Sequence, residues 1–300
     1  GVISVGELLQ AANEALAAAA RSAWVLLDRL DVAFAESSDL EHNALRALFR
    51  VYLDLLALEQ IRLKIFLRTD IWRRITAAGF REASHITRHL TIDWNARSLL
   101  NLVVSRAIQN DELQRFYSTT RQAVLTSADS QREFFYRMCP DQVDVGPNKP
   151  STFDWMLGRT RDGLGTNAPR ELIHLLNSLR EVQVRRLETG DAEPDGGLLF
   201  ARTSFKEALP EVSRVRLEQT LFAEYPALRH SLEKLRGAKT LHTVDTLSEL
   251  WGIDPGQAQK QADELVEVGF VERRGTRERP EYWVPFLYRD ALDLVQGAAE

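Results

Sequence analysis

Two short apolar runs separated by an amphipathic segment constrain how the first third of this chain can fold. The run Ala23–Leu27 carries no charge, and residues 63–67 form a second run that is mostly apolar. Between them, residues 40–60 place their large apolar side chains at helical spacing. A strand–helix–strand order of this kind favours parallel strands that neighbour each other in a sheet. We therefore expect a buried strand at the first run and a second strand at residues 63–67, with ligands bound beyond their carboxyl ends.

After residue 94 the periodicity becomes helical, so the predicted fold class is α/β followed by a mainly α part. Helical patterns cover residues 99–108, 116–125 and 131–138. A further helix is opened by Pro169, because proline is favoured in the first turn of a helix. The polar, turn-rich stretch 190–197 is the best linker candidate.

Composition excludes several classes of function. The single cysteine, Cys139, excludes an internal disulfide and a cysteine-based zinc cluster, which fits a cytoplasmic protein. The net charge of -5 gives no general attraction to nucleic acid, so any DNA contact needs a local basic patch. No uncharged apolar run approaches the roughly 18 residues of a membrane span, and we expect no membrane partner. The pair His85 and His89 lacks a third ligand, so no metal beyond magnesium is expected.

Polar residues follow both predicted strands. Asp28 comes directly after the first run and Asp31 three residues later, whereas Arg68 and Thr69 follow the second run. Magnesium beside nucleotide phosphates needs few carboxylates and many waters, so one acid at a strand end suits such a site. The alternative interpretation is that these residues only form a polar turn or cap the next helix.

These motifs, in this order over residues 20–180, resemble the STAND/AAA+ class of P-loop ATPases. The resemblance implies that Asp28 is the Walker B acid, which binds the Mg ion of a bound Mg–ATP complex. It also implies that Arg68 and Thr69 sense the γ-phosphate. Arg170, at the start of the helix opened by Pro169, would then be a second sensor that couples a helical lid to the nucleotide.

Two departures from that family pattern bear on activity. Arg29 occupies the position of the acid that polarises the attacking water, which leaves Asp31 as its substitute, so hydrolysis is expected to be slow or absent. No Gly-x-x-x-x-Gly-Lys-Ser/Thr loop occurs in the chain, and residues 237–240 are only a near match. Since the chain starts at Gly1, we expect an upstream segment or a second chain to supply the phosphate loop.

Residues 233–296 resemble a winged helix-turn-helix. Helical patterns at 244–251 and 256–268 flank a turn, and two predicted strands with a polar tip follow them. The candidate DNA-binding residues are basic side chains of the second helix and of the wing: Lys260, Arg273, Arg274, Arg277 and Arg279. Acidic residues lie among all of them, so docking of a protein remains the alternative role.

The sequence thus predicts four parts: the C-terminal part of a P-loop ATPase core (1–94), a helical lid (95–189), a linker with connecting helices (190–232) and the winged helix (233–296). The predicted function is an ATP-dependent molecular switch in which lid closure moves the winged helix. The resemblance implies a role in bacterial signalling or phage defence, with DNA or further copies of the chain as candidate partners. The alternative is a non-catalytic adaptor that binds DNA or protein and is built on a degenerate ATPase fragment.

Overall fold

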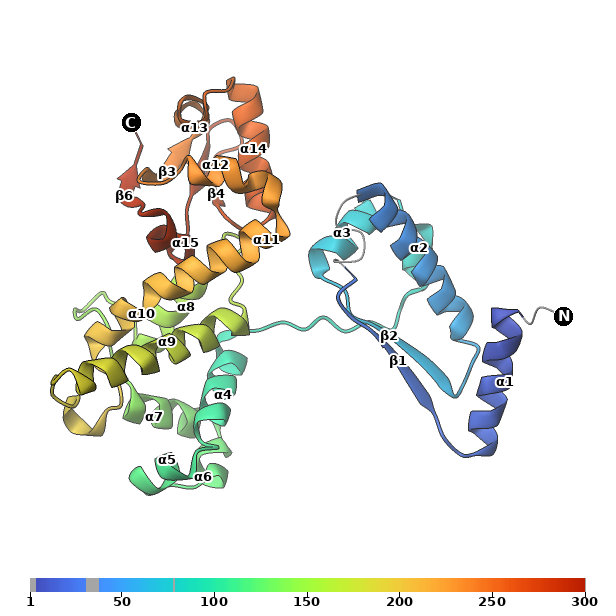
Figure 1. Ribbon diagram of the computed structural model, residues 1–300, viewed down its shortest axis with the longest axis horizontal. Helices are drawn as coiled ribbons and strands as arrows, with labels where there is room; N and C mark the ends of the chain where they lie inside the picture. Colours follow the sequence, from blue (N-terminus) through green and yellow to red (C-terminus); the bar gives the residue numbers. More distant parts are fainter. Residues whose placement is uncertain (1–3, 31–37, 78, 300) are drawn as a thin grey trace. The chain divides into compact units, whose positions relative to one another are not determined.

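The computed structural model describes residues 4–30, 38–77 and 79–299 (Figure 1). It is a mixed α/β structure that divides into two compact units, Gly1–Asp93 and Trp94–Glu300. Each unit is described separately below.

The first unit contains a small parallel sheet. Its elements are α1 (Val5–Ala18), β1 (Ala23–Leu27), α2 (Ser38–Leu55), β2 (Ile61–Ile65), α3 (Thr69–Ala77) and the 3-10 helix η1 (Arg81–His85). β1 pairs with β2 in parallel, with Ala23 opposite Ile61 and Leu27 opposite Ile65. The prediction of two neighbouring parallel strands is confirmed, although β2 begins and ends two residues earlier than predicted.

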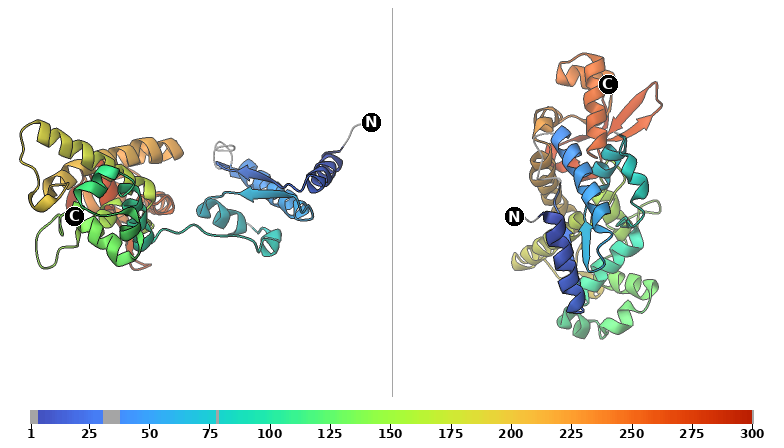
Figure 2. Two further views of the ribbon diagram at one scale, coloured as in Figure 1. Left: turned by 90° about the horizontal axis from the view of Figure 1, so that it is seen from below. Right: turned by 90° about the vertical axis from the view of Figure 1, so that its right-hand side faces the viewer.

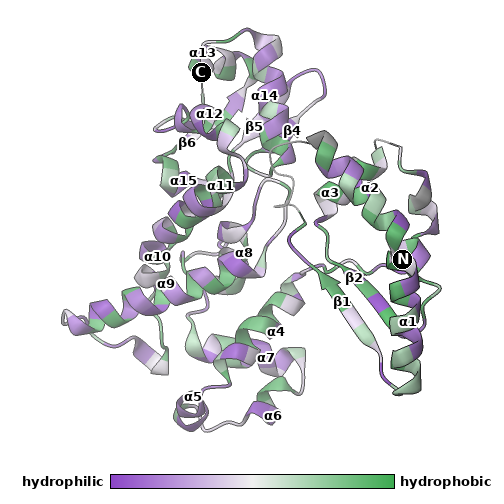
Figure 3. Cartoon of the chain, turned by 45° about the vertical axis from the view of Figure 1, so that its right-hand side comes forward, coloured by the Kyte–Doolittle hydropathy of each residue, from purple (hydrophilic) through white to green (hydrophobic). Residues whose placement is uncertain are grey.

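The expectation that the first strand is buried is wrong. The exposed fractions of Trp24, Val25 and Leu26 are 61%, 46% and 59%, and Figure 3 shows the apolar colouring of this strand. In the described residues the sheet has only two strands, and its core of Leu45, Phe49, Ile71, Ile75, Phe80 and Ile86 comes from the helical segments after β1 and around β2. An apolar run indicates burial only where other elements cover both of its faces.

The second unit begins with helices. They are α4 (Ala96–Ala107), α5 (Asp111–Phe116), α6 (Arg121–Leu125), α7 (Ala128–Met138), α8 (Thr152–Thr160), α9 (Pro169–Glu188), α10 (Arg202–Val215), the π-helical η3 (Arg216–Leu221), α11 (Phe222–Glu224) and α12 (Arg229–Glu233), with 3-10 turns η2 (Asp195–Gly197) and η4 (Pro226–Leu228). The stretch 116–125, predicted to be one helix, is divided between α5 and α6. The chain turns at Ser118, whose φ is 47°, and Thr120 then caps α6 by accepting a hydrogen bond from the Ala123 amide.

The end of the chain, residues 239–298, forms a helix and sheet assembly that we call the C-terminal module. It contains β3 (Lys239–Thr243), α13 (Val244–Trp251), α14 (Pro255–Glu267), β4 (Glu272–Gly275), β5 (Pro280–Trp283), α15 (Phe286–Arg289), η5 (Asp290–Leu292) and β6 (Val295–Ala298). The strand order is β4-β5-β3-β6. The predicted helices and hairpin are confirmed, whereas β3 and β6 were not predicted. Gly252, with φ of 69°, ends α13 in the left-handed conformation that favours glycine.

One hydrophobic core continues through the whole second unit, from Leu99 in α4 to Leu292 beside α15. The predicted linker is held against the helices, since Tyr117 donates to the Gly197 carbonyl at 2.9 Å and the Leu199 amide donates to Met138 at 2.9 Å. α9 and α10 run side by side in this unit (Figure 1). Among the described residues, no helix combines the length and the apolar character that crossing a bilayer requires.

Candidate functional site

The parallel pairing brings two of the predicted site segments to the same end of the sheet. Asp28 directly follows β1, and the ladder continues past β2, because the Phe66 amide donates to the Leu27 carbonyl at 2.8 Å. Arg68 is half-buried and its carbonyl accepts from the Trp72 amide at 3.1 Å, while Thr69 is the first residue of α3. Asp28 and the Arg68–Thr69 segment therefore follow the carboxyl ends of two adjacent strands.

The turn after β1 presents the Asp28 carboxylate to solvent. Asp28 is exposed, and its Oδ1 accepts a 2.8 Å hydrogen bond from the amide of Arg29. Arg29 itself has φ of 56°, an unusual backbone conformation for a side chain of this size. Oδ2 has no hydrogen-bond partner among the described residues. Asp31 lies outside the described residues.

This end of the sheet is followed by one carboxylate on the first segment and by a guanidinium and a hydroxyl group on the second. Magnesium in proteins is bound by carboxylates, and guanidinium groups bind phosphates. The described residues contain no group of three or more His, Cys, Asp or Glu side chains arranged to hold a metal. The pair His85 and His89 is exposed on and after η1.

Arg170 belongs to the second unit, where it is the second residue of α9 and is exposed. The N-cap residue Ala168 makes no side-chain hydrogen bond to the start of this helix. The neighbouring Glu171 is buried and its Oε1 accepts from Arg216 Nη1 at 2.9 Å. Glu171 is thus paired with Arg216, and the Arg170 guanidinium faces the solvent at a helix end that attracts anions.

A buried polar cluster around Arg216 was not predicted. Its members come from separate segments: Asp162 from the loop after α8, Glu171 from α9, Arg216 from η3 and Tyr288 from α15. Burial disfavours the Arg216 charge, but Tyr288 and Glu171 raise its pKa above the usual value. Burial also raises the pKa of Asp162. The cluster fastens the helices of the second unit to the C-terminal module.

The β4–β5 hairpin carries the arginines predicted for the wing, and Figure 2 shows it projecting from the module. Two of these arginines are engaged within the chain. Arg273 forms an ion pair with Asp263 of α14, and Arg274 Nε donates to Glu272 at 2.9 Å. Arg277 and Arg279 lie in the exposed turn between the strands. Of the four predicted wing arginines, the two at the tip of the hairpin are therefore those without a carboxylate partner among the described residues.

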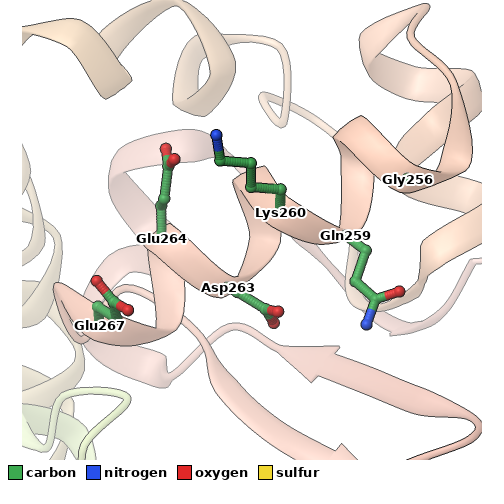
Figure 4. Close-up of a pocket in the computed structure, with 6 residues that line it drawn as sticks. All are labelled: Gly256, Gln259, Lys260, Asp263, Glu264 and Glu267. Carbon is green, nitrogen blue, oxygen red and sulfur yellow. The ribbon is translucent and has the colours of Figure 1, made fainter.

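The exposed face of α14 is acidic. A hollow on this helix is lined by Gly256, Gln259, Lys260, Asp263, Glu264 and Glu267. In Figure 4 Lys260 and Glu264 extend to the same side of the helix, whereas Asp263 points to the other side. Glu264 lies on the side of Lys260, and Asp263 and Glu267 add negative charge to the same helix, so Lys260 stands in an unfavourable field for DNA.

Comparisons with known proteins do not assign the chain to a family. No family model matches it, and neither a curated protein nor a solved structure matches it. Functional inference for this chain consequently depends on the arrangement of its own residues.

Proposed function

We propose that this chain contributes half of a nucleotide site to an ATP-dependent molecular switch of the STAND/AAA+ class. The observation that supports this proposal is the parallel β1–β2 pair, whose adjacent carboxyl ends carry Asp28 and the Arg68–Thr69 segment. Asp28 would hold magnesium, and Arg68 and Thr69 would contact the γ-phosphate. Arg170 would contribute a positive charge from the start of α9.

The residues fit the metal side of such a site better than its phosphate side. Asp28 is exposed, and its Oδ2 has no hydrogen-bond partner within the described part of the chain. Tight binding of a triphosphate also needs backbone amides that cradle the phosphates, and the sequence contains no loop of that type. The proposed partner is therefore a segment or second chain that supplies this loop.

The test is magnesium-dependent ATP binding by the full-length protein, measured by titration calorimetry. Asp28→Asn should weaken the magnesium-dependent part of the affinity by roughly tenfold, which corresponds to about 1.4 kcal/mol. Asp93→Asn, a matched change at another exposed aspartate of the same unit, should have no effect. An intact protein that binds no nucleotide, or an Asp28→Asn variant that binds like wild type, would refute the proposal.

A second candidate function is carried by the C-terminal module. Together with the preceding helix α12, the module has the order α12–β3–α13–α14–β4–β5, with β5 between β4 and β3, which is the arrangement expected of a winged helix. We infer that this module is the output of the switch, or of a non-catalytic adaptor, and that its hairpin contacts DNA or protein. Because the module shares its core with the helices that carry Arg170, a movement of those helices would carry the hairpin with it.

A further inference from the structure

Three arginines and two aromatic rings form a continuous stack on the C-terminal module. We call it the arginine–aromatic ladder, and its members in order are Arg159, Phe286, Arg289, Trp283 and Arg274. The guanidinium carbons of Arg159 and Arg289 lie 3.5 and 3.9 Å from the centre of the Phe286 ring. Arg289 and Arg274 lie 4.7 and 3.8 Å from the centre of Trp283. Each ring is thus in contact with two cations.

The ladder connects three elements. Arg159 comes from α8, Phe286 and Arg289 from α15, and the remaining two from the hairpin. Arg274 opposes Glu281 across the hairpin, while its neighbour Arg273 opposes Tyr282 and turns to Asp263 of α14. Alternation along a strand places Arg273 and Arg274 on opposite faces of the hairpin. The ladder therefore occupies the face that points away from the acidic helix α14.

The positive charges of the ladder are incompletely neutralised. Arg159 has one ion pair, at 4.0 Å to Asp144, whose other oxygen is held more closely by Lys206 at 2.6 Å. Arg289 forms no ion pair within the described part of the chain; it donates to the Val284 carbonyl at 2.9 Å and to Gln296 at 3.5 Å. Arg274 is paired with Glu272 through Nε at 2.9 Å and Nη2 at 3.2 Å. The charges with the least compensation in the ladder are therefore those of Arg159 and Arg289.

The pKa directions agree with this geometry. Burial lowers the pKa of Arg289 to about 10, and the charges of Arg159 and Arg274 add to that effect. Asp290 lies near enough to attract Arg159 and Arg289, but burial raises the pKa of its own carboxyl. An added anion would relieve the repulsion among the three arginines.

We propose that the arginine–aromatic ladder binds the phosphates of a nucleic-acid backbone, and that the ladder and the hairpin tip, rather than α14, form the nucleic-acid contact of the module. This inference rests on the second candidate function. The ring faces are taken up by guanidinium groups, which leaves no face for base stacking. Arg289 is buried and holds the stack together, so phosphate would bind the edge of Arg159 and, in competition with Glu272, that of Arg274. Arg277 and Arg279 follow Arg274 in the exposed turn of the hairpin.

The experiment is fluorescence anisotropy of the full chain with a labelled DNA duplex and with its single strand, at several salt concentrations. Arg159→Gln and Arg274→Gln should each weaken binding about tenfold and reduce the slope of log K against log salt by about 0.9. Two control variants should bind like wild type: Lys260→Gln on α14 and Arg185→Gln on an exposed part of α9.

Three further measurements separate phosphate binding from a merely structural stack. Arg159→Lys keeps the charge, so it should keep the wild-type salt slope even if looser stacking lowers the Tm. Wild-type protein that fails to bind either nucleic acid, or that binds inorganic phosphate alone, overturns the proposal. A salt slope unchanged in Arg159→Gln and Arg274→Gln also overturns it. None of these outcomes alters the ATP measurement, which tests Asp28 separately.

Discussion

Arg216 Nη1 donates a 2.9 Å hydrogen bond to Glu171 Oε1 and so joins the first turn of α9 to the π-helical segment after α10. The side chains are 17% and 5% exposed, and Glu171 Oε2 is buried with no hydrogen-bond partner among the described residues. The pair therefore lies in a low-dielectric environment, and the loss of hydration of the Glu171 carboxylate is only partly compensated by hydrogen bonds. The loss of one member would leave the other charged and buried.

The first prediction concerns this pair. Glu171→Ala should lower the free energy of unfolding by about 3–5 kcal/mol, because it leaves the Arg216 guanidinium buried without its carboxylate. Urea unfolding followed by circular dichroism measures the change. Arg214→Gln, which removes the exposed ion pairs to Glu211 and Glu218, is the control and should cost about 0–1 kcal/mol. Equal losses in the two variants would show that Glu171 is not a buried partner.

The second prediction compares two glycines. A Cβ atom at Gly163 would lie 2.4 Å from the Val271 carbonyl oxygen, and the Gly163 amide donates to Gly269 at 2.7 Å. Gly163→Ala should therefore force the two backbones apart and cost about 1–3 kcal/mol. Gly158→Ala should instead stabilise by about 0.5–1 kcal/mol, because Gly158 lies on the exposed side of α8 with open space around it. A Gly163→Ala variant as stable as wild type would contradict the close approach.

The third prediction is a pH dependence that comes from His242 in β3. Burial lowers its pKa below the ordinary value of 6.5, while a 2.7 Å hydrogen bond from Nε2 to the Lys239 carbonyl acts in the opposite direction. The folded protein then binds this proton more weakly than the unfolded chain. Stability from neutral His242 is present above about pH 6.5 and falls as the pH decreases through the lowered pKa.

His242→Gln tests this dependence in unfolding measurements made between neutral and mildly acidic pH. The free energy of unfolding of wild type should fall more steeply below pH 6.5 than that of the variant. His230→Gln removes an exposed histidine of the same unit and should leave the steeper wild-type dependence unchanged. Parallel curves for wild type and His242→Gln would exclude a buried, neutral His242.

The fourth prediction concerns the open face of β1. Trp24 is 61% exposed, and the Nζ of Lys64 lies 5.0 Å from the centre of its ring. Trp24→Ser should lower the free energy of unfolding by less than about 1 kcal/mol. Phe49→Ala should cost about 3–5 kcal/mol, because that ring packs against Trp72 and Phe80 at 5.1 and 5.9 Å. A large loss in Trp24→Ser would mean that another segment covers β1 in solution.

Sequence periodicity predicted the elements that have strong local signals. β1, α13 and α14 were located to within a residue or so, because an apolar run, a glycine at a helix end and buried alanines of α14 mark them directly. β3 was missed, since Lys239–Thr243 is short and has one apolar residue, Leu241, while its two buried side chains, Thr240 and His242, are polar. Burial of β1 could not be judged locally, because it depends on which elements cover each face of the sheet.

In the candidate sites, too, some residues could be predicted from local sequence and others could not. The place of Asp28 at a strand end follows from the apolar run before it. The cluster of Asp162, Glu171 and Arg216 could not be predicted, because its members are brought together only by tertiary packing. The ladder had one usable signal: Phe286 and Arg289 are three residues apart, a spacing that places side chains near one another on a helix.

The shared core of the second unit has a consequence for how this protein can change over evolutionary time. Three hydrogen bonds join the C-terminal module to the rest of the second unit. They connect Gly163 with Gly269, Ser213 with Ala291, and Arg216 with Tyr288. A recombination event that transplanted residues 239–298 into another gene would expose the apolar and charged surfaces that these contacts cover. We therefore expect residues 94–300 to be inherited as one block. New specificities would then arise by substitution in the hairpin turn, where Arg277 and Arg279 can vary without disturbing the interior.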